Sequence, residues 1–202
     1  MNILNKLKKN KEGFTLIELM VATSLFTIVM LMGVGALVTS SNSSKSAQKL
    51  RIAVDNVNLA METMTRELRT GTHFYCGGNM TPYFVGDCPA GTFGDIITFN
   101  PQQVGVNPPS RVGYYLKKRV VNGVDQGTFT LQRCEVFATN CSDIVSSNVN
   151  VTKLKFYVKG SELPPTDTIQ PSVEILMNGV VKIKGKEVPF TLQSMATQRS
   201  SE

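Results

Sequence analysis

An apolar run of 25 residues, positions 14–38, dominates the hydrophobic pattern of the chain. It contains one charged residue, Glu18, and no proline. A helix needs about 20 apolar residues to cross the hydrocarbon core of a bilayer. The pattern therefore predicts a membrane-spanning helix over residues 14–38.

A helical periodicity follows the polar stretch TSSNSSKS at residues 39–46. Apolar residues recur at alternating spacings of three and four: Ala47, Leu50, Val54, Val57, Met61, Met64 and Leu68. Charged residues fall on the opposite side, which we expect to be solvated: Lys49, Arg51, Asp55, Glu62, Arg66, Glu67 and Arg69. Such a stripe predicts one buried helix face, with Gly71 as the stop.

Joined to the apolar run, the stripe extends the predicted helix from Phe14 to about Arg69, a length of about 84 Å. Two features predict a bend or a melted stretch within it. These are the glycines of Gly33–Gly35 and the serine-rich residues 39–46, since glycine and serine are poor helix formers.

The remainder of the chain has the pattern of strands. We expect them at Ile96–Phe99, Val112–Val121, Thr128–Phe137, Val151–Lys159, Val173–Ile183 and Val188–Ala196. Asn122-Gly123 and the Lys-Gly-Lys sequence at 184–186 predict hairpin turns, and the double prolines at 108–109 and 164–165 predict loops. The predicted fold class is α+β, with an antiparallel sheet of five or six strands packed by one face on the helix.

The charge is unevenly distributed. The chain carries 21 Lys+Arg and 15 Asp+Glu, a net +6, and residues 1–13 contribute four lysines and one glutamate, a net +3. Without them the charge is 6 − 3 = +3, which is weak support for nucleic acid binding. Basic residues stand before the apolar run and none follows until Lys45. This asymmetry predicts residues 1–13 in the cytoplasm and residues 39–202 outside.

The four cysteines, Cys76, Cys88, Cys134 and Cys141, all follow the apolar run. No two form a C-x-x-C pair, so a zinc site is poorly supported. An even number in an exported segment favours two disulfides, for which three connectivities are possible. The sequential pairing closes the shortest loops and is the one we favour.

The sequence offers no catalytic constellation. His73 is the single histidine, which rules out histidine-based triads and multi-histidine metal sites. We therefore predict a protein that is not an enzyme and has no cofactor or metal. The aromatic residues Phe74, Tyr75, Tyr83 and Phe84 are expected to form a small satellite core, with a binding surface as the alternative.

Three interpretations of the N-terminus compete. A signal peptide, cleaved near Val34-Gly35-Ala36, would have a shorter apolar core. A plain signal anchor leaves Glu18 unexplained, since a carboxylate at mid-membrane costs roughly 2.5 kcal/mol or more. The third interpretation starts from the residues Gly13, Phe14 and Glu18, with Glu18 at the fifth position after the glycine.

This last arrangement resembles the processing site of type IV prepilins. The resemblance implies that prepilin peptidase cuts between Gly13 and Phe14 and that Phe14 becomes N-methylated. It also implies that Glu18 meets the new α-amino group of a neighbouring subunit during filament assembly. The corresponding domains are a removed leader (1–13), a transmembrane and filament-core helix (14–38), its amphipathic continuation (39–70) and a β-rich head (71–202).

The head is similar, more loosely, to J-type minor pseudopilins of type II secretion and W-type minor pilins. The similarity rests on Met64–Arg69, Gly113–Leu116, Leu131–Arg133, Val149–Gly160 and Phe190–Ser194. It implies a non-catalytic minor subunit anchored in the inner membrane and then built into a pilus or pseudopilus. Its partners would be other pilin subunits, prepilin peptidase and the inner-membrane assembly platform. The alternative is a tip-located adhesin or DNA-binding minor pilin.

Overall fold

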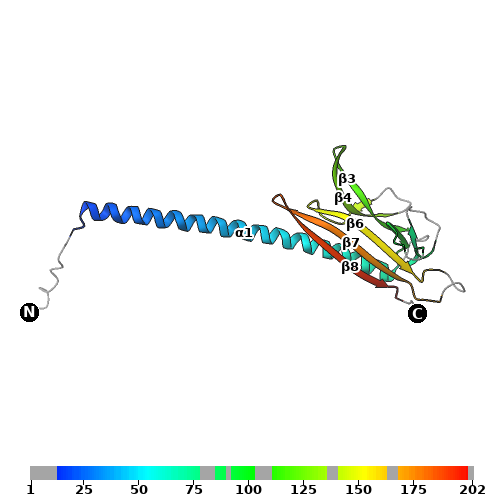
Figure 1. Ribbon diagram of the computed structural model, residues 1–202. Coiled ribbons are helices and arrows are strands. Elements are labelled where there is room, and N and C mark those ends of the chain that lie inside the picture. Colours follow the sequence, from blue (N-terminus) through cyan, green and yellow to red (C-terminus); the bar gives the residue numbers. More distant parts are fainter. Residues whose placement is uncertain are drawn as a thin grey trace, which may run out of the picture. The chain divides into compact units, whose positions relative to one another are not determined.

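A computed structural model describes residues 13–77, 85–89, 92–102, 111–135, 141–162 and 168–199 (Figure 1). In these ranges one helix, α1 (Leu16–Thr70), precedes eight strands, so the α+β class is confirmed. The strands are β1 (Thr72–Gly77), β2 (Ile96–Asn100), β3 (Val112–Val121), β4 (Val124–Glu135), β5 (Cys141–Asp143), β6 (Val149–Lys159), β7 (Ser172–Ile183) and β8 (Lys186–Thr197). The chain divides into two compact units, Met1–Ala47 and Gln48–Glu202, which are described separately.

In the first unit, α1 runs without a break through Gly33–Gly35 and the serine-rich residues 39–46. The prediction of a melted stretch there is wrong. Hydroxyl groups bond back to the helix instead of competing with it: Thr39 Oγ1 donates to the Gly35 carbonyl at 2.9 Å, and Ser46 Oγ to that of Asn42 at 3.0 Å. Helix propensity is a weak prior that such contacts override.

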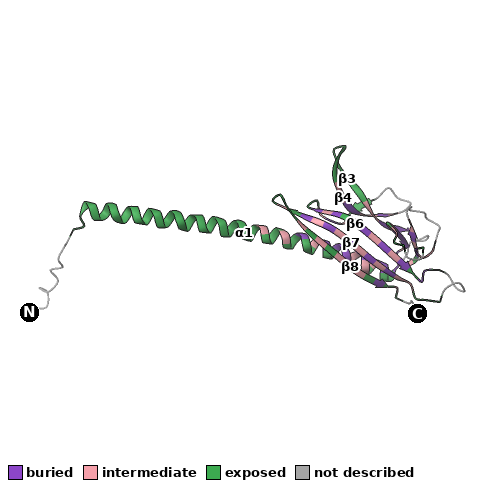
Figure 2. Cartoon of the chain, viewed as in Figure 1, coloured by how far each residue is buried: buried purple, intermediate pink, exposed green. Residues whose placement is uncertain are grey.

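In the second unit, α1 contributes one face to the core of the head (Figure 2). Its buried residues are Ala53, Val57, Ala60, Met61, Met64 and Leu68. The predicted stripe is therefore correct from Val57 onward and Leu50 packs partly buried against the core, whereas Ala47 is exposed and Val54 is 41% exposed. Gly71 follows the last helical residue, as expected. A Cβ there would lie 2.5 Å from the Phe99 ring, so only glycine lets the chain turn this close to β2.

The strands form two antiparallel sheets, in the orders β1-β2-β3-β4-β5 and β6-β7-β8. The predicted single sheet of five or six strands is wrong in this respect. Strands β1 and β5 were not predicted: β1 is distorted at His73, whose φ is 57°, and β5 has only three residues. Both predicted hairpin turns are present, at Asn122-Gly123 and Lys184-Gly185, with positive φ at all four residues. Residues 107–109, 163–165 and 136–137 lie outside the described ranges.

Described residues between β1 and β2, in the ranges 85–89 and 92–95, connect the two sheets. Gly94 exchanges two backbone hydrogen bonds with Phe156 of β6, each 2.8 Å long. Gly86 likewise lies beside β1, donating to the Phe74 carbonyl and accepting from the Cys76 N–H. A Cβ at Gly94 would lie 2.6 Å from the Cys76 sulfur, so this approach requires glycine. These bonds occupy outward backbone groups of Phe74 and Cys76 in β1 and of Phe156 in β6.

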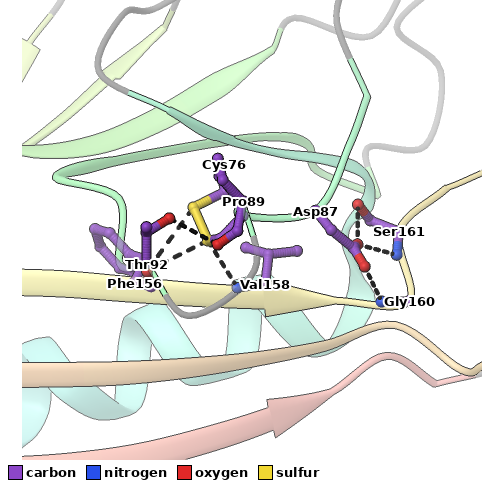
Figure 3. Close-up of a disulfide and its surroundings, with 9 residues drawn as sticks. Cys76, Asp87, Pro89, Thr92, Phe156, Val158, Gly160 and Ser161 are labelled. Carbon is purple, nitrogen blue, oxygen red and sulfur yellow. Dashed lines mark hydrogen bonds between the residues drawn. A yellow bond between two sulfur atoms is a disulfide. The ribbon is translucent and has the colours of Figure 1, made fainter.

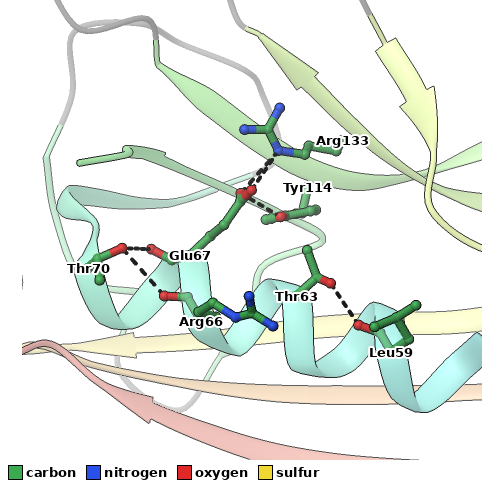
Figure 4. Close-up of polar contacts among 7 residues, drawn as sticks. All are labelled: Leu59, Thr63, Arg66, Glu67, Thr70, Tyr114 and Arg133. Atoms are coloured by element: carbon green, nitrogen blue, oxygen red, sulfur yellow. Dashed lines mark hydrogen bonds and ion pairs between the residues drawn. The ribbon is translucent and has the colours of Figure 1, made fainter. Parts of the chain in front are cut away.

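A buried polar cluster joins α1 to the five-stranded sheet (Figure 4). Glu67, predicted on the solvated side of the helix, instead turns toward the sheet. Its carboxylate accepts a hydrogen bond from the Tyr114 hydroxyl at 2.7 Å and forms an ion pair with Arg133 Nε at 3.0 Å. Tyr114 is fully buried, and the Glu67 and Arg133 side chains are about three-quarters buried. Burial, together with the hydrogen bond to Glu67, raises the pKa of Tyr114 well above its ordinary value.

Replacing Glu67 by alanine should lower the free energy of unfolding by about 2–3 kcal/mol, because Tyr114 and Arg133 would lose their shared partner while remaining mostly buried. The matched control is Glu62→Ala, which removes a carboxylate from the same helix. Glu62 pairs with Arg66 in solvent, with both side chains about 70% exposed, so its loss should cost less than about 0.5 kcal/mol. Urea unfolding of the detergent-solubilised oxidised protein measures both, and equal losses would contradict the cluster's role.

Tyr114 should also make the head sensitive to alkali. An unfolded tyrosine loses its proton near pH 10, whereas the folded-state pKa is higher, so the folded state holds the proton longer. Tyr114 therefore has no effect on the pH dependence of stability below about pH 9, and stability falls above about pH 10 by up to ~1.4 kcal/mol per pH unit. Urea midpoints between about pH 8 and 11 should fall less steeply in Tyr114→Phe. Tyr157→Phe serves as the control: its urea midpoints should fall with pH as steeply as those of the parent protein.

Candidate functional site

The start of α1 is an N-terminal cap formed by Thr15. The Glu18 backbone N–H donates to Thr15 Oγ1 at 3.3 Å, and the helix begins at Leu16. Thr15 and Glu18 have the Thr-x-x-Glu spacing of a capping box. A carboxylate in the first turn is also favoured by the helix dipole. Sequence reasoning missed this structural role of Glu18, although the spacing was available to indicate it.

Gly13 and Phe14 precede the helix. The Phe14 side chain is 82% exposed, and a Cβ added to Gly13 would meet nothing within 4 Å. The peptide bond between them therefore lies two residues before the first helical residue, outside the hydrogen-bonded turns. A cut at this bond would leave the Thr15 cap intact.

The apolar part of α1 is exposed throughout residues 14–38 (Figure 2). This stretch is long and apolar enough to cross a membrane by length and composition, and none of it is buried within the chain. A continuous apolar surface of this size marks a site that a lipid or another protein covers.

Hydroxyl groups within the apolar stretch are bonded to the helix itself. Thr23 donates to the Leu19 carbonyl at 3.0 Å, Ser24 to Val21 at 2.8 Å and Thr27 to Thr23 at 2.7 Å. Polar groups satisfied in this way enter an apolar medium at low cost. The Glu18 carboxylate differs, since it makes no ion pair with any residue in the described part of the chain. In an apolar medium, the Glu18 carboxylate would therefore need a positively charged partner from another molecule.

Both disulfides follow the sequential pairing, Cys76–Cys88 and Cys134–Cys141. The first is buried and lies against β6 (Figure 3), where Cys88 and Val158 exchange a backbone bond and an N–H to sulfur bond, each 3.1 Å long. The neighbouring Asp87 carboxylate accepts from the N–H groups of Gly160 and Ser161, at 2.9 and 2.7 Å. The segment that connects the two sheets is thus fixed to both β1 and the end of β6.

The second disulfide joins facing residues of β4 and β5. Cys134 is buried and Cys141 is exposed at the outer edge of the five-stranded sheet. This bridge holds the three-residue strand β5 in place. Neither disulfide lies in the unit that contains Gly13, Phe14 and Glu18, so the predicted site residues form two separate groups.

The structure assembles no catalytic set from the remaining candidates. His73 is exposed, and its Nδ1 lies 3.0 Å from the neighbouring Thr72 hydroxyl. Among the described residues, no three His, Cys, Asp or Glu side chains come together as metal ligands. Phe74 packs on Phe99 in the main core, so the predicted satellite core is wrong for this residue, and residues 83–84 lie outside the described part.

Comparison with known proteins supports the resemblance at the N-terminus. The family model of the prokaryotic N-terminal methylation motif matches residues 8–34. The chain is also 29% identical over 75 residues to the pilin-like protein PilA3 of Thermus thermophilus, which covers 37% of this chain and 32% of that protein. The chain thus spans about a third of the length of this relative. No solved structure matches the chain.

The methylation motif covers the residues that precede and open α1, including Gly13, Phe14 and Glu18. It coincides with the capped start of an exposed apolar helix, and a β-rich head follows in the sequence. Motif, helix and head agree with the similarity to PilA3. We conclude that the chain resembles type IV pilin-like proteins, most clearly at its N-terminus.

Proposed function

We propose that this protein is a non-catalytic subunit of a filament, either a type IV pilus or a type II secretion pseudopilus. The observation that carries the proposal is the exposed apolar helix with a single carboxylate, opened by the methylation motif at residues 8–34. Before assembly, residues 14–38 would be covered by lipid, with the head outside and residues 1–13 in the cytoplasm. After assembly, the helices of neighbouring subunits would cover one another.

Processing by prepilin peptidase would hydrolyse the amide between Gly13 and Phe14. The products would be a leader ending in the Gly13 carboxylate and a mature chain whose Phe14 amine is then methylated. The accessible, non-helical position of this bond supports the proposal. The mature chain would begin one residue before its helix cap.

Glu18 would then select the position of the incoming subunit. An unpaired carboxylate is costly once apolar helices exclude water from it, and an ammonium group at contact distance offsets much of that cost. The N-terminal amine of a neighbouring mature subunit is such a group. The same carboxylate would therefore favour the helix start in the monomer and the axial register in the filament.

The finer assignment is to a minor, J- or W-like subunit. It rests on the loose similarity of the head and on the position of the last cysteine, Cys141, far from the C-terminus, where major pilins often have a disulfide-bounded loop. The assembly platform and prepilin peptidase would be its transient partners. A tip-located adhesin or DNA-binding role is the alternative, which the modest net charge of +3 without the leader does little to favour.

The processing step predicts that the mature protein begins with N-methyl-Phe14. Gly13→Val should leave at least about 90% of the protein unprocessed, because a branched side chain at the cut site would obstruct the peptidase. The substitution itself meets open space in this chain, so a local clash cannot explain the loss. Gly33→Val is the matched control, since that position is equally open and lies away from the cut. Intact mass spectrometry of the membrane-extracted protein identifies the N-terminus of the mature chain. An N-terminus other than N-methyl-Phe14 would contradict the proposed processing.

The register role predicts a separate defect for Glu18→Gln. The variant should be processed and inserted normally, but its share in sheared filaments should fall at least about tenfold relative to the membrane pool, because the ion pair is lost in an apolar surrounding. Thr15→Ala is the control. It removes the cap, which costs about 1 kcal/mol of helix stability, and keeps the carboxylate. Equal assembly defects in the two variants would show that the helix start, not the charge, is what matters.

A further inference from the structure

Strand β8 is a long sheet edge that the head leaves open. Gly86 bonds the outer side of β1 at Phe74 and Cys76, Gly94 and Cys88 bond that of β6 at Phe156 and Val158, and β5 is only three residues long. Strand β8 has twelve residues and is paired on one side with β7. Proteins usually shorten or cover such edges, because their free N–H and C=O groups bind other strands.

Two hydrogen bonds establish which backbone groups of β8 point outward. The Gln198 N–H donates to the Pro171 carbonyl beyond the start of β7, whereas the Arg199 N–H donates to the Arg69 carbonyl of α1, both at 2.8 Å. The backbone N–H and C=O groups of successive residues in a strand point to alternate sides. In β8, those of the odd-numbered residues therefore point away from β7. Pro189 lies on this outward series, where its missing N–H costs no ladder bond. The outward backbone groups of Thr191, Gln193 and Met195 make no hydrogen bond within the described part of the chain.

A groove runs beside this edge. It has a volume of about 530 Å³ and lies between residues 58–69 of α1 and residues 192–194 of β8. Met61 and Leu192 line it together with Thr65, whose hydroxyl lies 3.2 Å from that of Ser194. The groove therefore combines an open strand edge, apolar side chains and one wall made by a helix, which is the arrangement that suits an added peptide strand.

The two ends of the groove differ in chemistry. A small apolar hollow adjoins it and shares Asn58 and Leu192 with it; Val54, Val57, Val181 and Phe190 complete its lining. At the other end stand Arg66 and Arg69. Arg66 pairs with Glu62, whereas Arg69 forms no ion pair with any described residue. The helix from Val54 to Arg69 spans about 22 Å, the length of six or seven extended residues.

We propose that this groove binds an extended segment of a partner protein by strand addition to β8. The segment would place apolar side chains beside Val54 and Phe190 and a carboxylate beside Arg69. This site goes beyond the proposed function and does not depend on filament assembly. A second copy is disfavoured as the occupant: two β8 edges paired about a two-fold axis would bring Arg69 of one copy toward the turn that carries Lys184 and Lys186 of the other.

The test uses the full chain in detergent and three fluorescent heptapeptide probes of defined sequence. All three contain the apolar segment VTVTV. The first has two aspartates at the C-terminal end, the second has two aspartates at the N-terminal end, and the third has two lysines in place of the aspartates. Fluorescence anisotropy should show at least one acidic probe binding about tenfold more tightly than the lysine probe at low salt. Arg69→Glu should reverse that preference. Equal binding of the acidic and lysine probes, or no binding at all, would overturn the proposal.

Backbone pairing is tested by a second pair of variants. Gln193→Pro removes one outward N–H and should lower the affinity for the acidic probe about tenfold. Gln193→Ala keeps that N–H, so its affinity for the same probe should lie within about twofold of that of the parent protein. A probe N-methylated at alternate residues should bind the unaltered protein about tenfold more weakly, which avoids any folding defect of the proline variant. Equal affinity of the methylated and unmethylated probes contradicts strand addition. Efficient disulfide cross-linking between two copies of Gln193→Cys would overturn the assignment in favour of a second copy.

Discussion

The apolar surface of α1 between residues 14 and 38 is the constraint on which the rest of the protein depends. That surface is exposed on every side within the chain, so it cannot be stable in water without lipid or another helix around it. The hydroxyl groups of Thr23, Ser24 and Thr27 donate hydrogen bonds to carbonyls of their own helix. The Glu18 carboxylate is then the polar side-chain group of this stretch that still lacks a partner among the described residues. In the absence of a partner, Glu18 already stabilises the start of the helix, through the Thr15 cap and the helix dipole.

The second half of α1 meets a different requirement, because the head must hold one of its faces. Small residues, Ala53 and Ala60, allow close packing, and Met61, Met64 and Leu68 fill the core. Hydrophobic burial does not specify register along the helix, whereas the contact of Glu67 with Tyr114 and Arg133 does, since each group has a single position in which it is satisfied. The two sheets are then connected by the segment around the Cys76–Cys88 bridge, which contacts β1 and β6.

The sequence predicted those parts of the fold whose pattern is local. The helix and the hairpin turn at Asn122-Gly123 follow from periodicity and turn chemistry, and the strands from β-branched and aromatic runs. Features that depend on distant contacts were missed. Glu67 looked solvated because helix periodicity cannot show what a sheet brings to the polar face. Strand β1 was missed because His73 interrupts its alternation, and the split into two sheets because strand order is not encoded locally. At the N-terminus, Gly13, Phe14 and Glu18 needed only a contiguous motif, which the family comparison also matches.

The open edge of β8 follows from how the head is connected. Described residues between β1 and β2 bond the outer side of β1 through Gly86 and that of β6 through Gly94, whereas no described residue bonds the outward backbone groups of Thr191, Gln193 and Met195 in β8. The Arg199 N–H bonds the helix end at Arg69, so the last turn of α1 and the end of β8 are fixed to each other, while the strand before this point stays unpaired on its outer side. A groove that is rigid at one end and lined by a packed helix along its length needs little reorganisation to accept a strand, and binding is tighter where less order has to be imposed. The same α1 would thus serve two kinds of contact: its apolar half for helices or lipid, and the exposed side of its second half for an extended chain.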